Sequence, residues 1–443
     1  MTIDLNTTSW LHKNCPGFYV KGDNIEIINS PQQFYRSLLH KIQTSNHRIT
    51  ISSLYIGTGN LEEELVNAID KRMCEKLHLK VCILLDRLRG TRGDPNSLML
   101  LLPLIKKHKN RLQLSLYTTP ILRDYKLYMP QRLNEGLGVQ HIKAYIFDND
   151  IIISGCNLSE LYFTHRQDRY ILLQNAPNLI QYIDDVVKTV CLHSEQVTGK
   201  LGNVSKNNAL ISQTLGKAVK KLISKYTVTP NGLESDTIIY PTIQMFQHGI
   251  IQDLTATRDL FMNTNSTDSV YISSGYFNMP DLFTDTFTLS KAKFHVLAAS
   301  EQANGFYKAQ GLSRYIPTMY LQLSNQFLEL IKDSNKHIKY YEFQKENWSF
   351  HAKGIWYYKN GDDFPFLTLI GSPNYGYRSV WRDLELQFFI QTNNNSLKRK
   401  LDTECKSLYH PSTTAEISSK VIRRDRHVAT YVKLATKLLR GFL

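Results

Sequence analysis

The sequence contains little cysteine, and its six cysteines lie far apart in the chain. They are Cys15, Cys74, Cys82, Cys156, Cys191 and Cys405. No two of them form a Cys-x-x-Cys pair, so neither a zinc knuckle nor a disulfide framework is indicated. A reducing compartment is the simpler expectation.

Long apolar runs and a recognisable targeting signal are also missing from the sequence. No stretch of about 18 apolar residues occurs, so we predict no membrane-spanning helix. Residues 1–30 contain Asp4, and no arginine precedes Arg36. This composition fits neither an Arg-rich transit peptide nor the apolar core of a secretory signal. Targeting would therefore be unconventional or would depend on sequence upstream.

Glycine and proline are not enriched, at 22 and 14 of the 443 residues, and 42% of the residues are hydrophobic. These values are typical of a globular protein and exclude a low-complexity chain. A chain of this length is too long for one ordinary core, so two domains are expected. The formal net charge of +14 favours anionic partners, which include nucleic acid, anionic lipid and phosphorylated small molecules.

Apolar periodicity predicts an α/β domain in the first half of the chain. The predicted strands are 48–56, 79–85 and 112–117, and the predicted helices are 31–42, 61–73, 96–107 and 180–192. Because strands and helices alternate, we expect a largely parallel sheet.

The same order of signals returns in the second half, where strand patterns occur at 269–276, 293–299 and 338–343. This recurrence favours an internal duplication over two unrelated halves that share strand composition. The expected division is an N-terminal segment (1–30), a first half (31–195), a connecting segment (196–235), a second half (236–396) and a basic amphipathic tail (397–443).

A short motif of a His and a Lys two residues apart occurs once in each half, followed by a turn that ends in Asn. The copies comprise His141, Lys143 and Asn157 in the first half and His351, Lys353 and Asn374 in the second. On an extended strand, residues two apart point to the same face. Each copy would then aim an imidazole and an ammonium at one point, and the two copies would surround one phosphate.

These residue types suit phosphodiester chemistry without a metal ion or another cofactor. A neutral imidazole can attack phosphorus, and a protonated imidazole can donate a proton to the leaving oxygen. The lysines would stabilise charge on the phosphate oxygens, and the asparagines would hydrogen-bond the phosphate or the histidines. A carboxylate behind each histidine would fix its tautomer, and the candidates are Asp168 and the pair Asp383 and Glu385.

The arrangement resembles the phospholipase D superfamily, whose signature is His-x-Lys, an Asp and a Gly-Ser-x-Asn turn, once per half. Asp148 and Ser372 fit this signature. Two positions depart from it, because Ser154-Gly155 reverses the small residues and Tyr358 stands where the second Asp would be. In the family that Asp is a structural residue.

The resemblance implies an α/β fold of two similar phospholipase D-like domains. Each would be a mixed, mostly parallel sheet flanked by helices, and a pseudo-two-fold relation would give them one shared active site. The catalytic residues that it implies are His141, Lys143, Asp148, His351 and Lys353.

Five longer strings, at 51–59, 137–143, 162–170, 350–356 and 369–379, resemble one branch of this superfamily, the eukaryotic phosphatidylglycerophosphate synthases. The resemblance implies transfer of a phosphatidyl group from CDP-diacylglycerol to glycerol-3-phosphate. By analogy, His141 would carry the phosphatidyl group and His351 would act as acid and base. The resemblance further implies an anionic membrane surface as partner, a peripheral place on the mitochondrial inner membrane and no nucleic acid.

Two groups of arginines are candidates for substrate binding. Arg87, Arg89 and Arg92 follow the carboxyl end of a predicted strand, where α/β sheets usually bind ligands. They could hold the phosphate of glycerol-3-phosphate or form a solvated basic loop, and Arg378 and Arg382 leave the same two interpretations open.

The sequence also leaves alternatives open for the position of the C-terminal tail and for the overall function. An amphipathic helix over 428–442 could lie on an anionic membrane or pack on its own domain. Another phosphatidyltransferase or a phospholipase of the same superfamily would share the motifs. A phosphodiesterase acting on nucleic acid would suit the charge, but the sequence lacks an alternating aromatic and basic groove.

Overall fold

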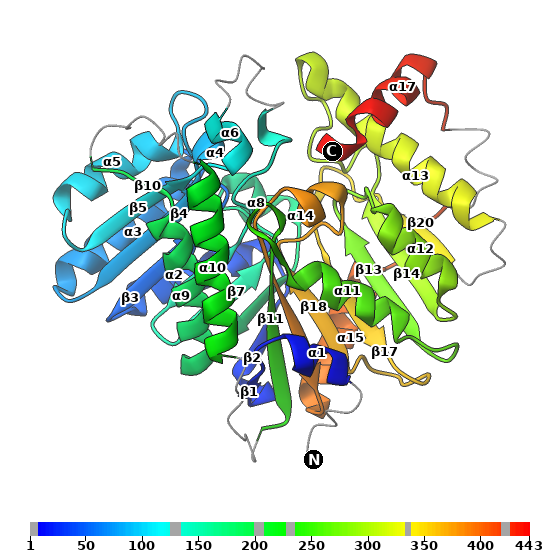
Figure 1. Ribbon diagram of the computed structural model, residues 1–443, viewed down its shortest axis with the longest axis horizontal. Helices are drawn as coiled ribbons and strands as arrows, with labels where there is room; N and C mark the ends of the chain where they lie inside the picture. Colours follow the sequence, from blue (N-terminus) through cyan, green and yellow to red (C-terminus); the bar gives the residue numbers. More distant parts are fainter. Residues whose placement is uncertain (1–7, 125–133, 199–207, 227–234, 333–337, 418–425) are drawn as a thin grey trace.

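Two mixed β-sheets, each covered by helices, lie side by side in the computed structural model (Figure 1). The structure describes residues 8–124, 134–198, 208–226, 235–332, 338–417 and 426–443. Within these ranges no helix combines the length and apolarity that crossing a membrane requires.

The first sheet has the strand order β10-β5-β4-β3-β6-β7-β9-β2. Its strands are β2 (Ile25–Ile28), β3 (Arg48–Ser52), β4 (Lys80–Asp86), β5 (Leu112–Tyr117), β6 (Ala144–Phe147), β7 (Asp150–Ser154), β9 (Tyr170–Leu173) and β10 (Glu195–Gln196). Strand β2 comes from the expected N-terminal segment, so that segment contributes to the sheet.

The second sheet has the order β1-β11-β19-β18-β17-β13-β14-β15-β20, with β12 paired to β11. Its strands are β1 (Phe18–Val20), β11 (Thr237–Met245), β12 (Ile250–Ile251), β13 (Ser269–Ser274), β14 (Lys293–Ala299), β15 (Ile338–Phe343), β17 (Gly354–Tyr358), β18 (Leu367–Gly371), β19 (Glu385–Thr392) and β20 (Thr414–Glu416). A separate parallel pair, β8 (Arg166–Gln167) and β16 (Ser349–Phe350), joins the two halves.

Seven strands of each sheet follow the same order, because β5-β4-β3-β6-β7-β9-β2 corresponds to β15-β14-β13-β17-β18-β19-β11. The topology therefore confirms the repeat that the sequence predicts. The expectation of mostly parallel sheets is wrong. Among the described strands of the two sheets, only β3-β4-β5 and β13-β14-β15 pair in parallel. The later strands are joined by short connections and run antiparallel.

Helices cover the outer faces and the junction of the sheets. In the first half they are α2 (Pro31–Thr44), α3 (Asn60–Glu75), α4 (Arg87–Gly90), α5 (Ser97–Lys107), α6 (Pro120–Asp124), α8 (Glu160–Thr164), α9 (Pro177–Leu192) and α10 (Asn208–Tyr226). Helix α2 begins where the Ser30 side chain accepts a hydrogen bond from the N–H of Gln33 and proline occupies the first turn, a typical N-cap. Its buried face contains Phe34, Leu38 and Ile42 at helical spacing.

The second half carries α1 (Ser9–Asn14), α11 (Gln252–Met262), α12 (Asp281–Leu289), α13 (Ile316–Lys332), α14 (Tyr377–Trp381), α15 (Asn395–Leu408) and α17 (Thr430–Leu439). Short 3-10 turns are η2 (Gly22–Asn24), η3 (Phe246–His248), η4 (Gly311–Tyr315) and η5 (Arg440–Phe442). Helix α15, which begins the expected tail, buries Leu397, Leu401 and Cys405 in the main core.

One hydrophobic core belongs to both halves of the molecule. It contains Ile146 and Val186 from the first half and Trp356 and Phe388 from the second. The two halves therefore fold against one another, and residues about two hundred positions apart are held in fixed relation.

Candidate active site

Both His–Lys pairs lie immediately before a strand. His141 and Lys143 precede β6, and His351 and Lys353 precede β17. Their expected placement within an extended strand is therefore wrong.

Backbone hydrogen bonds to the opposite half hold each His–Lys segment in place. The N–H of His141 donates to the carbonyl of Leu384 (2.9 Å), and the N–H of His351 donates to the carbonyl of Gln167 (2.8 Å). Each of these carbonyls belongs to the residue directly before a carboxylate, Glu385 or Asp168. The same geometry thus occurs twice.

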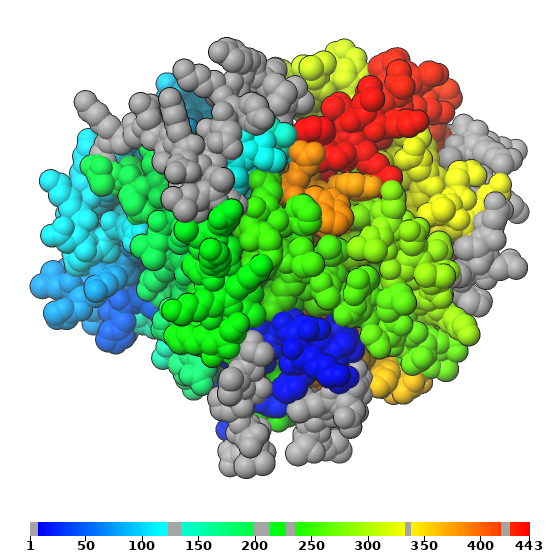
Figure 2. Space-filling view, in the orientation of Figure 1, coloured from blue at the N-terminus to red at the C-terminus, as the bar shows by residue number. Residues whose placement is uncertain are grey.

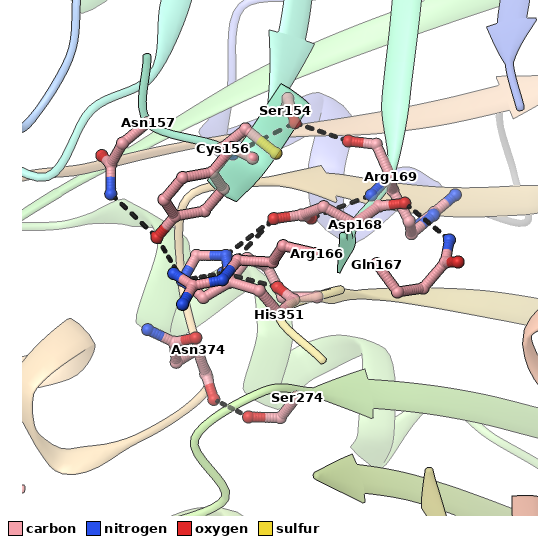
Figure 3. A network of polar contacts seen from close by, with 12 residues as sticks. Ser154, Cys156, Asn157, Arg166, Gln167, Asp168, Arg169, Ser274, His351 and Asn374 are labelled. Carbon is pink, nitrogen blue, oxygen red and sulfur yellow. Dashed lines mark hydrogen bonds and ion pairs between the residues drawn. The ribbon is translucent and has the colours of Figure 1, made fainter. Parts of the chain in front are cut away.

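The side chains of the two histidines also contact the opposite half. Nδ1 of His141 lies 2.9 and 3.0 Å from the two carboxylate oxygens of Glu385. Nδ1 of His351 lies 2.7 Å from Oδ2 of Asp168, and the two groups point towards one another in Figure 3. The carboxylates that the sequence suggests do lie behind the histidines, and each serves the histidine of the other half.

The third candidate carboxylate does not contact a histidine in this way. Oδ1 of Asp383 accepts hydrogen bonds from the N–H of Val139 (3.0 Å) and from Arg378 (3.1 Å). Asp383 therefore connects a cavity arginine to the segment that precedes His141.

Burial lowers the pKa of both histidines well below the usual range. The ammonium of Lys143 lowers the pKa of His141 further, and that of Lys353 lowers the pKa of His351. Both imidazoles are therefore neutral near pH 7. Because Nδ1–H is donated to a carboxylate, Nε2 is left as the nucleophilic or basic nitrogen.

The pKa values of the two carboxylates are raised, in the direction opposite to those of the histidines. Burial raises the pKa of Glu385 to about 7, although Lys143 opposes the shift. Burial also raises the pKa of Asp168, against the effect of Lys353. Each histidine and its carboxylate are therefore joined by a hydrogen-bonded proton and do not form a permanent ion pair.

The two lysines are fully buried beside the histidines. Nζ of Lys143 has no hydrogen-bond partner among the described residues, and burial lowers its pKa well below the usual range. Nζ of Lys353 donates to the carbonyl of His351 (2.7 Å), and burial lowers its pKa to about 8. An anion placed near them would favour the charged form of both lysines.

The surroundings of Gly155 explain why the first copy of the motif has Ser154-Gly155 in place of the Gly-Ser order. A Cβ atom at this position would come within 2.3 Å of Cδ of Lys353. The lysine of the second half therefore passes over the turn of the first half, and only glycine leaves space for it.

The asparagines lie at the cavity with different partners. Nδ2 of Asn157 donates to the hydroxyl of Tyr162 (3.0 Å), which lies 3.4 Å from Nε2 of His351 (Figure 3). Oδ1 of Asn374 is buried with no hydrogen-bond partner among the described residues. Ser372 accepts from the N–H of Leu386 (3.1 Å) and so orders the strand that carries Glu385.

Asp148 lies outside the cavity, and its inclusion among the catalytic residues is corrected. Its carboxylate accepts hydrogen bonds from the N–H groups of Asn46 (2.7 Å), His47 (2.8 Å) and Arg48 (2.9 Å). It thereby fixes the start of β3 at the far end of β6. Because Asp148 has a structural role, Tyr358 can occupy the matching position of the second half.

A cavity of about 320 Å³ opens between the two halves and is lined by both histidines. Arg89, Arg92 and Arg378 also line it. Arg87 and Arg382 do not. Arg87 pairs with Glu195 (3.0 Å), and Arg382 donates to the carbonyl of Gly136 (2.9 Å).

Sequence reasoning missed several residues of the cavity wall. They are Tyr55, Glu135, Tyr162, Arg166, Tyr276 and Tyr320. Tyr162 and Arg166 belong to the string 162–170, where the resemblance offered a signal. The rings of Tyr162 and Tyr276 meet the ring of His351 edge-on, with centroids 5.0 and 5.6 Å away.

Two clusters in the described part of the chain have the donor types of a metal site. His141, Asp383 and Glu385 form one, and their ligand atoms lie within 4.8 Å of one another. The direct contact of His141 with Glu385 and the hydrogen bond from Val139 to Asp383 already account for that closeness. The second, Asp70 with Cys74 and His108, lies away from the cavity, and Asp70 pairs with Lys107 (2.7 Å) and His108 (2.7 Å).

Comparison with known proteins gives a consistent result. The CDP-diacylglycerol–glycerol-3-phosphate 3-phosphatidyltransferase of Gallus gallus, named as mitochondrial, is 36% identical over 479 residues, covering 98% of this chain and 86% of its own. The Homo sapiens protein of that name is 35% identical over 98% of this chain and 85% of its own. The Saccharomyces pastorianus protein is 35% identical over 99% and 91%. No protein-family model matches the chain.

Among solved structures, the phosphatidylserine synthase of Haemophilus influenzae superposes with a TM-score of 0.79 at 17% identity, over 100% of both chains. This similarity concerns the fold. The fold and the paired His–Lys motifs define a class of two-halved α/β proteins that resemble the phospholipase D superfamily. Within it, the chain belongs to the family of CDP-diacylglycerol–glycerol-3-phosphate 3-phosphatidyltransferases.

Proposed function

We propose that the protein transfers the phosphatidyl group of CDP-diacylglycerol to glycerol-3-phosphate, which yields phosphatidylglycerophosphate and CMP. One observation carries the chemistry. Two neutral histidines, each oriented by a carboxylate of the other half, line one cavity together with basic residues. The names of the relatives support the two substrates.

In the first step, Nε2 of His141 attacks the phosphatidyl phosphorus, and a nitrogen–phosphorus bond forms as the bond to CMP breaks. His351 gives its proton to the leaving oxygen. The anionic phosphates of the donor favour protonation of His351 on binding, because an opposite charge nearby raises the pKa of an imidazole. Lys143 and Lys353 stabilise the charge that develops on the phosphate oxygens.

In the second step, His351 takes the proton of an acceptor hydroxyl. The hydroxyl oxygen attacks phosphorus, and the bond to His141 breaks. The assignment of the acid and base to His351 is supported by the Tyr162 hydroxyl, which lies 3.4 Å from its Nε2. This hydroxyl can relay a proton to and from Nε2.

The phosphate of glycerol-3-phosphate binds at Arg89, Arg92 and Arg378, which we call the anion site. All three line the cavity that holds the histidines. Guanidinium groups match the oxygens of a phosphate in pairs of hydrogen bonds. Arg87 and Arg382, which face other partners, stay outside this site.

The protein works as a peripheral enzyme on an anionic membrane, the mitochondrial inner membrane. Helix α17 supports this placement (Figures 1 and 2). Its exposed face carries Tyr431, Leu434 and Leu438, which are 64%, 61% and 72% exposed. Lys433 and Lys437 lie beside them and are exposed as well. An apolar ridge flanked by lysines suits the boundary of an anionic bilayer.

The proposal is tested by incorporation of labelled glycerol-3-phosphate into lipid with CDP-diacylglycerol, with and without a chelator. We expect incorporation that survives the chelator and is lost in His141→Ala and in His351→Ala. His295→Ala, which changes a histidine outside the cavity, is the matched control. Normal activity of either cavity variant would overturn the two-histidine mechanism. Turnover of labelled oligonucleotides alone, or transfer only to serine, would replace the proposed activity.

A further inference from the structure

Two arginines of the anion site already hold a carboxylate of the protein. Nη1 of Arg89 lies 3.2 Å from Oε2 of Glu135, and Nη1 of Arg92 contacts Oε1 of the same residue. The side chains of Arg89, Arg92 and Glu135 are 18%, 29% and 14% exposed. All three line the cavity that contains His141 and His351.

The position of this group relative to the histidines is fixed by one buried residue. Oδ1 of Asp86 accepts from the N–H of Arg89 (3.0 Å), and Oδ2 accepts from the N–H of Gln140 (3.0 Å). Gln140 directly precedes His141. The face of the Tyr55 ring lies under the Arg89 guanidinium at 4.5 Å. Asp86 and Tyr55 therefore hold Arg89 in addition to its ion pair with Glu135.

Arg378 brings a third guanidinium to the same cavity from the other half. Burial acts to lower the pKa of Arg378, while the carboxylates of Asp383 and, more weakly, Glu135 raise it. Glu135 thus lies within electrostatic reach of all three arginines. One carboxylate supplies one charge and two oxygens, whereas a phosphate monoester supplies up to two charges and three oxygens.

We propose that Glu135 is an internal substitute for the acceptor's phosphate, which occupies Arg89 and Arg92 until a phosphate monoester displaces it. This inference rests on the proposed function and adds the selection of the acceptor. A neutral acceptor without a phosphate, such as glycerol, cannot compensate for the loss of the Glu135 ion pairs. Glycerol-3-phosphate can, so the site accepts phosphorylated alcohols and excludes neutral ones.

The test measures binding directly. Wild-type protein and Glu135→Gln are titrated calorimetrically with glycerol-3-phosphate, inorganic phosphate and glycerol. Without the competing carboxylate, Kd for both phosphates should fall about fivefold or more, since the binding-competent arginines are no longer occupied. Glycerol should bind no better. Glu63→Gln makes the same charge change at an exposed position outside the cavity and should leave every Kd unchanged.

Weaker or unchanged binding of glycerol-3-phosphate to Glu135→Gln would overturn the inference, because Glu135 would then position the arginines or bind the glycerol hydroxyls. Tighter inorganic phosphate with unchanged glycerol-3-phosphate would overturn the acceptor assignment. Glu135→Ala is the second variant if Glu135→Gln does not fold.

Failure of the proposed function gives a different pattern. Wild-type protein would then transfer nothing to glycerol-3-phosphate, although Glu135→Gln still bound both phosphates more tightly. If transfer occurs and the tightening does not, the inference about Glu135 alone fails.

Discussion

Each histidine of the cavity depends on a carboxylate that lies far away in the sequence. His141 and Glu385 are 244 positions apart, and Asp168 and His351 are 183 positions apart. An imidazole whose Nδ1–H is held by a carboxylate presents Nε2 in one tautomer and one direction. The exchange therefore makes each half dependent on the other for its chemistry.

Asp168→Asn should reduce kcat on the order of 10³-fold, because the amide no longer favours the tautomer with a proton on Nδ1 of His351. The melting temperature should change little in comparison. Asp285→Asn, an exposed change on α12, is the control. A variant with nearly normal kcat and an unchanged pH–rate profile would contradict the positioning role of Asp168.

The pH dependence of activity should be bell-shaped. Activity should rise through about pH 7, where Glu385 loses its proton and can accept from His141. It should fall above about pH 8, where Lys353 loses its charge. Because the titrating groups are coupled, the pKa values obtained from kcat/KM across this pH range belong to the coupled system and not to single residues. A profile that stays flat through pH 8 would exclude Lys353 as the titrating cation.

Lys143→Met should stabilise the protein and abolish transfer. The pKa of Lys143 is lower in the folded state than in the unfolded chain, so burial of its charge costs stability at neutral pH. That cost disappears as pH rises through the window between the two pKa values. We expect a gain of about 1 kcal/mol in the free energy of unfolding at pH 7. Denaturant titration measures it, with exposed Lys400→Met as control, and a loss of stability would contradict the argument.

At the scale of elements, α17 divides its apolar residues between two faces. Val432 is buried in a small hydrophobic cluster with Met319 of α13, and Thr436 is also buried. Tyr431, Leu434 and Leu438 remain exposed. The two interpretations of this helix are therefore compatible, because one face packs on the protein while the other is available to a membrane.

The double variant Leu434→Glu/Leu438→Glu should weaken binding to anionic vesicles about tenfold or more, since each leucine loses apolar burial and gains repulsion. Its melting temperature should match wild type, because both side chains are exposed in the folded protein. Leu77→Glu, 72% exposed next to α3, is the control. Equal vesicle binding by the double variant and the control, in a flotation assay, would remove α17 as the docking element.

At the scale of the whole molecule, Arg169 connects the halves through a buried ion pair with Glu404. Its guanidinium contacts both carboxylate oxygens of Glu404 (2.9 and 2.7 Å) and donates to the carbonyl of Leu369 (2.6 Å). It also lies 3.8 Å over the ring of Trp356. Gly354 leaves the space for it, because a Cβ there would overlap the guanidinium.

Arg169→Met should cost roughly 3–5 kcal/mol of unfolding free energy, because Glu404 keeps a buried charge without its partner. The double variant Arg169→Met/Glu404→Gln should recover part of that loss. Urea unfolding of the single and double variants measures the coupling. A cost below about 1 kcal/mol in the single variant would show that the pair does not hold the halves together.

Much of the fold and the site followed from the sequence. The bounds 112–117, 293–299 and 338–343 agree with β5, β14 and β15, because buried strands leave a local apolar pattern. The duplicated His–Lys motif identified His141, Lys143, His351 and Lys353, and all four lie together between the halves. Local spacing is sufficient for such signals.

Tertiary structure alone decided which groups meet. In the folded protein Glu385 pairs with His141, Asp148 lies outside the cavity, and Glu135 pairs with Arg89 and Arg92. The later strands are also antiparallel. The physical reason is the same in each case. A sequence pattern records the periodicity of one segment, whereas these contacts depend on how segments separated by tens to hundreds of residues pack around a shared core.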